Sequence, residues 1–240
     1  MASPPRLEVW GVTGMPEVGR AADLAGLIAD AVVAQGDELR DRDVVVVTQK
    51  IVSKAEGAMA AIDADDPRGH RGVVEAESMR VLRRRGDLVI SETRHGFVCA
   101  NAGVDLSNVD AGWAALLPED SDRSARRIRD GLRARAGVEV GVVVSDTFGR
   151  PWRRGLTDVA IGSAGLAAVL DLRGTDDDRG RELHVTEVAI VDELAGAAEL
   201  VMGKADGIPV AVVRGAPAGW FRPGSVRDEI VRSPAEDLFR

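Results

Sequence analysis

Runs of apolar residues along the chain predict several short strands. Val44–Val47 is a continuous run of strand-forming residues, and a run of this kind is typical of a strand that is buried on both faces. Val142–Val144 is a second such run, and shorter apolar stretches predict strands at Leu7–Val12 and Ile208–Gly215. Together these runs predict a sheet whose two faces are both covered.

Helical periodicity is clearest after Asp23, where apolar residues recur at every third or fourth position until Gly36. Asp23 suits the N-cap of this helix and Gly36 suits its end. The pattern predicts further helices at 73–85, at 118–135, with Ser121 as a partial capping box, within 162–170 and after His184. Strands and helices mixed in this way predict an α+β (mixed α/β) fold with mixed sheets and flanking helices.

Two common nucleotide-binding folds lack their fingerprints in this sequence. No Gly-x-Gly-x-x-Gly motif opens a helix, and the stretch "MGKADG" has Ala205 where a P-loop requires Ser or Thr after the lysine. We therefore expect neither a Rossmann nor a P-loop fold. Residues 1–240 are interpreted as one domain or as two intertwined subdomains, with Asp63–Gly72 as a loop.

Composition narrows the classes of function. The formal net charge is −8, which argues against a broad nucleic-acid surface, because phosphate backbones recruit an excess of Lys and Arg. We find neither a signal-peptide pattern nor an apolar run long enough to span a bilayer, and Cys99 is the single cysteine. These features favour a cytoplasmic protein without a membrane or nucleic-acid partner.

Three polar loops are expected after apolar strands: "TQKIVSKAEG", "HGFVCANAGVDLSN" and "SDTFGRPWRRG". Strand ends are where ligands of sheet-based enzymes gather, so the loops are predicted to converge on one cleft. Asp105 and Asp146 are oxygen ligands suited to Mg²⁺ or Mn²⁺, and Thr147 adds a hydroxyl. The loops also carry cations that suit phosphates, namely Lys54, Arg150, Arg153 and Arg154.

Each of these residues also has a structural interpretation. Asp105 and Asp146 are turn-forming residues as well as metal ligands, and Asp158 could form only a salt bridge with Arg153 or Arg154. Lys50 and Lys54 would share one face of a helix, where lysines are usually solvated. The residue types alone therefore indicate an α/β enzyme that handles metal and phosphate.

Four long stretches together resemble one family, the coenzyme F420 γ-glutamyl ligases. They are "VTQKIVSKAEG", "HGFVCANAGVDLSNV", "SDTFGRPWRRGLTDVAIG" and "LVMGKADGIPVAVVRG", and the N-terminal "GVTGMPEVGRAADLAGLI" fits as well. The resemblance implies the fold particular to this family and a homodimer. In some bacterial relatives a flavin-binding domain follows the ligase domain, so the chain could be the first part of a longer protein.

The resemblance also implies an activity. It would be the GTP- and metal-dependent addition of L-glutamate to F420-0, and of further glutamates in some members, through an acyl phosphate. The cofactors implied are GTP and Mg²⁺ or Mn²⁺, and a monovalent cation is a further candidate. The alternatives are a metal-dependent phosphate-ester or nucleotide hydrolase, and a nucleotide- or deazaflavin-binding module without catalysis.

Site residues are carried over by position from the family motifs. Asp105 and Asp146 are implied to bind one divalent cation and Thr147 a second one. We assign catalytic roles to Asp146, Lys54, Arg150 and Arg153. The role of the arginines, together with Arg154, is a hypothesis from their charge and loop position: they would bind the phospholactyl or glutamate carboxylates of the substrates. Some members have Gln or Glu where Lys204 stands, so either the second metal is held differently here or Lys204 binds a phosphate. The implied nucleotide site consists of Met15, Pro16, Glu17, Val18, Gln49, Lys50, Lys54, Asn108, Met202, Gly203, Lys204, Ala205, Asp206, Gly207, Ile208 and Pro209.

Overall fold

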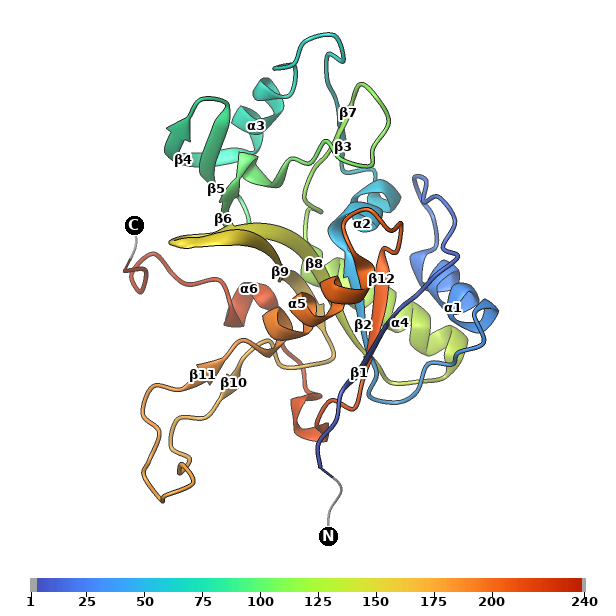
Figure 1. Cartoon of the computed structure of the whole chain (residues 1–240), viewed down its shortest axis with the longest axis vertical. Coiled ribbons are helices and arrows are strands. Elements are labelled where there is room, and N and C mark those ends of the chain that lie inside the picture. Colours follow the sequence, from blue (N-terminus) through green and yellow to red (C-terminus); the bar gives the residue numbers. More distant parts are fainter. Residues whose placement is uncertain (1–3, 239–240) are drawn as a thin grey trace.

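The computed structural model of the chain describes residues 4–238. Its centre is a five-stranded sheet in the order β1-β12-β2-β8-β9 (Figure 1). The pair β2–β8 is parallel, and the other neighbouring pairs are antiparallel. These strands are β1 (Glu8–Gly11), β2 (Val44–Thr48), β8 (Gly141–Arg150), β9 (Arg153–Ala164) and β12 (Val210–Arg214). The prediction of a mixed α/β fold is thereby confirmed.

Helices cover both faces of this sheet. Helix α4 (Ser121–Ala136) contacts β8 and β9, with α1 (Leu24–Ala34) packed against α4, while α5 (Ile190–Met202) contacts β1, β9 and β12 from the opposite face. Successive side chains of a strand point to opposite faces. Accordingly, Val45 and Val47 pack in the core on the α1–α4 side, whereas Val44 and Val46 pack in the core beneath α5. This explains the continuous valine run, whose four residues are fully buried.

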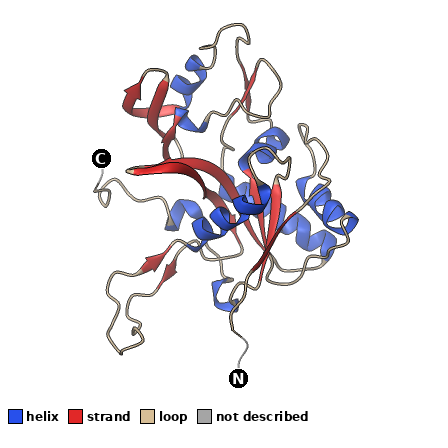
Figure 2. Cartoon of the chain, viewed as in Figure 1, coloured by secondary structure: helices blue, strands red, loops and turns tan. Residues whose placement is uncertain are grey.

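Three smaller sheets lie outside the central one (Figure 2). One pairs β3 with β7, one has the order β4-β5-β6, and one pairs β10 with β11. The bounds are β3 (Met59–Ala61), β4 (Ser78–Arg85), β5 (Leu88–Thr93), β6 (Val98–Ala100), β7 (Trp113–Ala115), β10 (Leu170–Asp171) and β11 (Glu187–Val188). The remaining elements are the helices α2 (Gln49–Glu56), α3 (Arg71–Glu77) and α6 (Val226–Glu229) and the short 3₁₀ helices η1 (Asn101–Gly103) and η2 (Ala218–Trp220).

Two helices predicted from the sequence are wrong. The helix expected at 73–85 ends at Glu77, and Ser78–Arg85 forms β4, which pairs with β5 through two irregularities of register. The helix expected within 162–170 is absent from that segment, because β9 continues to Ala164 and a bend follows. In both places pairing with a neighbouring strand determines the backbone, and local periodicity does not report such pairing.

Local capping signals decide where the two larger helices of the α1–α4 face begin. Asp23 caps α1 as predicted, since its carboxylate accepts a hydrogen bond from the Gly26 backbone N–H at 3.1 Å. Helix α4 is capped by Asp120, which accepts from the Arg123 N–H at 2.8 Å, and not by Ser121. Between residues 4 and 238, none of the helices combines the length and apolar character needed to cross a membrane.

Candidate functional site

A cavity of about 260 Å³ lies at the edge of the sheet where β2 ends, beside Ser145–Thr147 of β8. The two strands are parallel, and the last residue of β2, Thr48, lies opposite Ser145 in the middle of β8. The segment after β1 and the segment before β12 reach the same edge. The cavity is lined by Met15, Pro16, Glu17, Val18, Thr48, Gln49, Lys50, Ile51, Lys54, Asp105, Asn108, Ser145, Asp146, Thr147, Asp158, Glu199, Gly203, Lys204, Ala205, Gly207, Ile208 and Pro209.

Most of the site residues predicted from the sequence are therefore brought together. Two members of the predicted nucleotide loop are not among the lining residues: Met202 is fully buried at the end of α5, and Asp206 is exposed. Arg150, Arg153 and Arg154 also lie outside the cavity. They are exposed at the tip of the β8–β9 hairpin, so the role in substrate binding proposed for them stays a prediction.

The stretch "SDTFGRPWRRG" is not a loop, as the sequence analysis expected. Strand β8 continues through it to Arg150, and β9 returns from Arg153. Asp146 and Thr147 therefore lie on a strand, opposite Val159 and Asp158 of β9. A strand holds a side chain more firmly than a loop does, which suits residues that must orient a ligand.

Asp146 is the most strongly perturbed acid of the cavity. Burial raises the pKa of its carboxyl to about 7, and the carboxylates of Asp105 and Asp158 act in the same direction. The backbone N–H of Thr147 and the ammonium of Lys204 oppose this shift. A cation bound at Asp146 would favour its charged form, as would be expected of a metal ligand.

Asp158 lines the cavity, whereas only a salt bridge with Arg153 or Arg154 was expected of it. Its side chain is buried, and it accepts hydrogen bonds from the hydroxyl of Ser145 at 2.8 Å and from that of Thr147 at 2.7 Å. The hydroxyl of Thr147 in turn accepts from the Lys204 ammonium at 2.7 Å. A continuous chain of hydrogen bonds thus runs from Lys204 to Asp158.

Asp105 is held in place by three donors. Lys50 forms an ion pair with it at 2.9 Å, and the N–H and the hydroxyl of Ser107 each donate to it at 2.8 Å. Burial alone would raise the pKa of this carboxyl, but the hydrogen bonds from Lys50 and Ser107 outweigh that effect and lower it. Asp105 is therefore ionised at neutral pH and ready to bind a cation.

Helix α2 carries further polar residues of the cavity wall. Lys54 forms an ion pair with Glu17 of the loop that follows β1. Gln49 is fully buried, and its amide donates to the Ser53 hydroxyl at 2.7 Å and to the Leu116 carbonyl at 2.6 Å. Gln49 therefore fixes the start of α2, whereas the two lysines of this helix provide positive charge.

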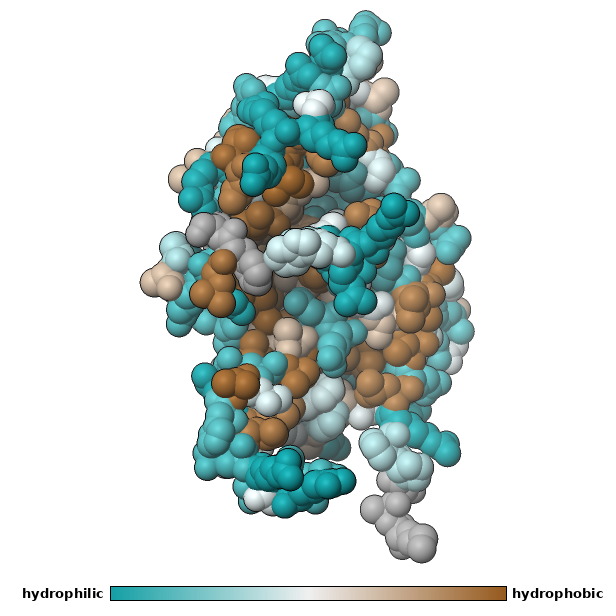
Figure 3. Space-filling model, turned by 60° about the vertical axis from the view of Figure 1, so that its left-hand side comes forward, coloured by the Kyte–Doolittle hydropathy of each residue, from teal (hydrophilic) through white to brown (hydrophobic). Residues whose placement is uncertain are grey.

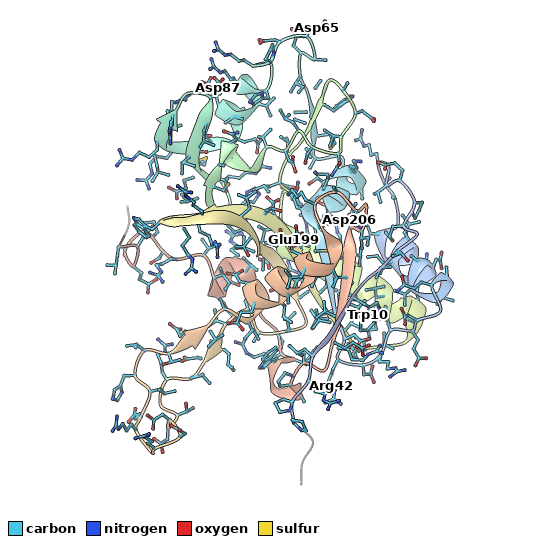
Figure 4. All side chains as sticks on the ribbon, in the orientation of Figure 1. Trp10, Arg42, Asp65, Asp87, Glu199 and Asp206 are labelled. Carbon is cyan, nitrogen blue, oxygen red and sulfur yellow. The ribbon has the colours of Figure 1, made fainter. Side chains whose placement is uncertain are left out.

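The loop 203–209 closes the cavity from the side of α5. Gly203 begins it with φ +61° and ψ 152°, a conformation almost restricted to glycine, and a Cβ there would overlap the Asp206 carboxylate. Glu199 lies in the last turns of α5, next to this loop (Figure 4). Glu199 was not predicted as a site residue, although it lies four residues after Ala195 and three before Met202, and so on the same face of the helix as these apolar residues.

The donor set was tested for its fit to a divalent cation. Within the described part of the chain, no group of three or more His, Cys, Asp or Glu side chains is arranged to hold a metal ion. Asp105 and Asp146 instead supply two carboxylates, which lie close enough for the negative charge of Asp105 to raise the pKa of Asp146. This fits Mg²⁺ or Mn²⁺ completed by water and phosphate oxygens, as is common for Mg²⁺.

The raised pKa of Asp146 predicts how stability depends on pH in the absence of metal. The folded pKa of about 7 exceeds the ordinary value of 3.8, so the folded state keeps a proton that the unfolded state has lost. The favourable contribution is complete below about pH 4 and is lost as the pH rises through 7. In metal-free buffer we expect Asp146→Asn to match the wild type near pH 4 and to be more stable at pH 8, by roughly 1–2 kcal/mol after allowance for solvent screening. Thermal melts at both pH values measure this, and an equal difference at both would contradict it.

A larger hollow of about 1450 Å³ lies elsewhere, between α1, α4 and the segment that follows β5. Its lining includes Asp23, Glu56, Arg94 and Arg127, and it contains none of Asp105, Asp146 or Lys204. Size alone would favour this hollow as the functional site. We assign the site to the smaller cavity, because the chemically matched carboxylates and lysines converge there.

The family comparisons agree with this geometry. The family model described as F420-0:Gamma-glutamyl ligase matches residues 13–215. The coenzyme F420:L-glutamate ligase of Methanothermobacter thermautotrophicus is 44% identical over 249 residues, covering 98% of this chain and 99% of the relative. The protein of the same name from Methanopyrus kandleri is 44% identical and covers both chains in full, and that of Methanocaldococcus jannaschii is 40% identical over 92% of each.

The family match includes every segment that lines the cavity, from Met15 to Pro209. The motifs that resemble the ligases are therefore the same segments that the fold gathers around Asp146. With a match over most of its length and relatives that are more than 40% identical over nearly all of it, this chain belongs to the F420-0:gamma-glutamyl ligase family.

Proposed function

We propose that the chain is a GTP- and divalent-metal-dependent ligase that joins L-glutamate to F420-0 through an amide bond. Full-length similarity to the named ligases supports the reaction. The observation that carries the use of GTP and metal is the cavity itself, where Asp105 and Asp146 lie with Lys50, Lys54 and Lys204. Phosphoryl transfer depends mainly on such positioned charges.

The proposed reaction has two steps. An oxygen of the F420-0 carboxylate attacks the γ-phosphorus of GTP, so that GDP leaves and an acyl phosphate forms. The α-amine of glutamate then attacks the acyl carbon, the bond to the phosphate oxygen breaks, and the amine loses a proton. The products are the amide, GDP and inorganic phosphate. A bound divalent cation, held by Asp105 and Asp146, would neutralise charge on the phosphates.

The chain's own residues can bind and orient these anions. Lys50 and Lys54 lie on one face of α2 and present ammonium groups to the cavity. The N-cap Thr48 makes no side-chain capping bond, so first-turn N–H groups of this eight-residue helix lack that partner. Helix N-termini favour anions, which suits a phosphate at this edge. The volume of about 260 Å³ suits the phosphate end of a nucleotide better than the whole molecule.

No side-chain nucleophile is required by this route, and neither a cysteine nor a histidine is among the described residues that line the cavity. Burial raises the pKa of the Cys99 thiol to about 12, so the thiol is not ionised at neutral pH. His95 lines the larger hollow and not the site. The residues present therefore favour direct phosphorylation of the substrate over a covalent enzyme intermediate.

We also propose that the ligase acts as a homodimer. Large apolar side chains are exposed on Leu156 of β9, on Val185 before β11 and on Leu200 of α5, with exposed fractions of 65%, 85% and 86%. Figure 3 shows apolar residues gathered in patches between polar ones on the face of the molecule it presents. Exposed apolar patches of this kind commonly mark protein interfaces.

The test is a coupled assay with purified protein, F420-0, L-glutamate, GTP and Mn²⁺ or Mg²⁺, read by mass spectrometry. We expect mass increments of glutamyl units that require both GTP and metal. GTP consumption without a glutamylated product would favour a hydrolase, and stoichiometric binding without turnover would favour a binding module. The same spectra count the glutamates added.

A further inference from the structure

The position of Lys204 in the site differs from that of the other two lysines. Lys50 and Lys54 each form an ion pair with an acid of the cavity wall, with Asp105 and Glu17 respectively. Lys204 instead donates its hydrogen bond to the neutral hydroxyl of Thr147, at 2.7 Å. Its positive charge acts on the carboxyl groups of Asp146 and Glu199 from this position.

Thr147 is thereby committed to partners within the protein. Its hydroxyl proton goes to Asp158, at 2.7 Å, and one of its lone pairs accepts from Lys204. Both oxygens of Asp158 are also engaged, because the second one accepts from the Ser145 hydroxyl. A metal ion at Thr147 would have to displace the ammonium or approach it against charge repulsion.

The charges of the cavity also disfavour a second metal ion at Thr147. Its lining holds five carboxylates, on Glu17, Asp105, Asp146, Asp158 and Glu199, against three ammonium groups, on Lys50, Lys54 and Lys204. The formal charge is therefore −2, which one divalent cation at Asp105 and Asp146 neutralises. Without the lysine the charge would be −3, and the space beside Thr147, Asp146 and Glu199 would favour another cation.

We propose that the Lys204 ammonium is a built-in cation of this site, so that the chain binds one divalent ion where the same cluster without the lysine binds two. The inference rests on the proposed function, because it concerns the metal that this function uses. It assigns Lys204 a positioning role toward Thr147 and Asp158, and it places the single divalent ion on the Asp105–Asp146 side.

The experiment counts bound metal directly. Metal-free wild type and the variants Lys204→Gln and Lys204→Arg are dialysed to equilibrium against Mn²⁺, with and without a non-hydrolysable GTP analogue. Bound Mn²⁺ per chain is measured by elemental analysis, and free Mn²⁺ by its electron paramagnetic resonance signal. Lys204 is exposed on a loop, so neither change disturbs the core, and circular dichroism checks that both variants fold.

We expect Lys204→Gln to bind one Mn²⁺ more per chain than the wild type, and Lys204→Arg, which keeps the charge, to match the wild type. The additional ion should also appear as spin coupling between two Mn²⁺ ions. If the wild type already binds two ions, or if Lys204→Gln binds no more than the wild type, the inference is overturned while the metal dependence stands. If no variant binds Mn²⁺, both the inference and the metal dependence of the proposed function fail.

Discussion

Replacing Asp146 by Asn is expected to lower the rate of ligation by roughly a thousandfold while leaving the fold intact. The substitution preserves shape but removes the negative charge that would hold the cation, and the loss of one such electrostatic group commonly reduces kcat by about 10²–10³. Asp146 lies on β8 beside Asp105 and Lys204, so no other described carboxylate of the cavity occupies its position.

The measurement is steady-state formation of the glutamylated product at saturating GTP and Mn²⁺, together with Mn²⁺ binding. Asp192→Asn is the matched control, because Asp192 is also an acid whose pKa is raised by burial, yet it accepts from the Ala160 N–H and does not line the cavity. The control should keep most of its kcat. An Asp146→Asn variant with more than about a tenth of the wild-type kcat would show that the carboxylate is not essential.

Gly162→Ala is expected to destabilise the protein by about 3 kcal/mol, the upper part of the usual range for overpacking. Gly162 lies on β9 opposite Val144, and α4 begins directly against it. A Cβ at this position would overlap the backbone carbonyl of Ser121, which cannot move without shifting the start of α4. The strand and the helix could then no longer approach so closely.

Chemical denaturation in urea, with the midpoint and slope both fitted, measures this effect. Gly149→Ala in the same hairpin is the control, because a Cβ there would meet only the Leu156 side chain at 3.9 Å. We expect the control to change stability by less than about 1 kcal/mol. Equal effects of the two substitutions would mean that loss of glycine flexibility, and not the contact with Ser121, determines the result.

Much of the central fold could be predicted from the sequence because its signals are local. The Val44–Val47 run and the Asp23 cap are each readable within a few residues, and both are confirmed. The helix expected at 73–85 is wrong because Ser78–Arg85 forms β4 by pairing with β5. The sequence of this segment does not indicate which strand it pairs with. Pairing between segments overrides local propensity there.

The convergence of the lysines, Asp105 and Asp146 on one cavity could be predicted from the sequence, but the hydrogen bonds that support these residues could not. Asp105 and Asp146 stand in long motifs, whereas the role of Asp158 depends on the register that sets it opposite Thr147 across the β8–β9 hairpin. That register includes irregularities after Val144 and after Gly149, which no sequence pattern announces. Arg150 and Arg153 lie at the hairpin tip because β8 extends to the first and β9 begins at the second.

The strand order also determines when during synthesis a working site can exist. The last strand of the sheet, β12, inserts between β1 and β2, and Glu8 pairs with Arg214. The parallel pair joins Val44 to Gly141, so its partners are far apart along the chain. Contacts between such distant segments form late and slow folding. A nascent chain that has not yet emerged beyond Pro209 therefore holds Asp105, Asp146 and Asp158 but cannot close the cavity around them, and we expect activity only once β12 has docked.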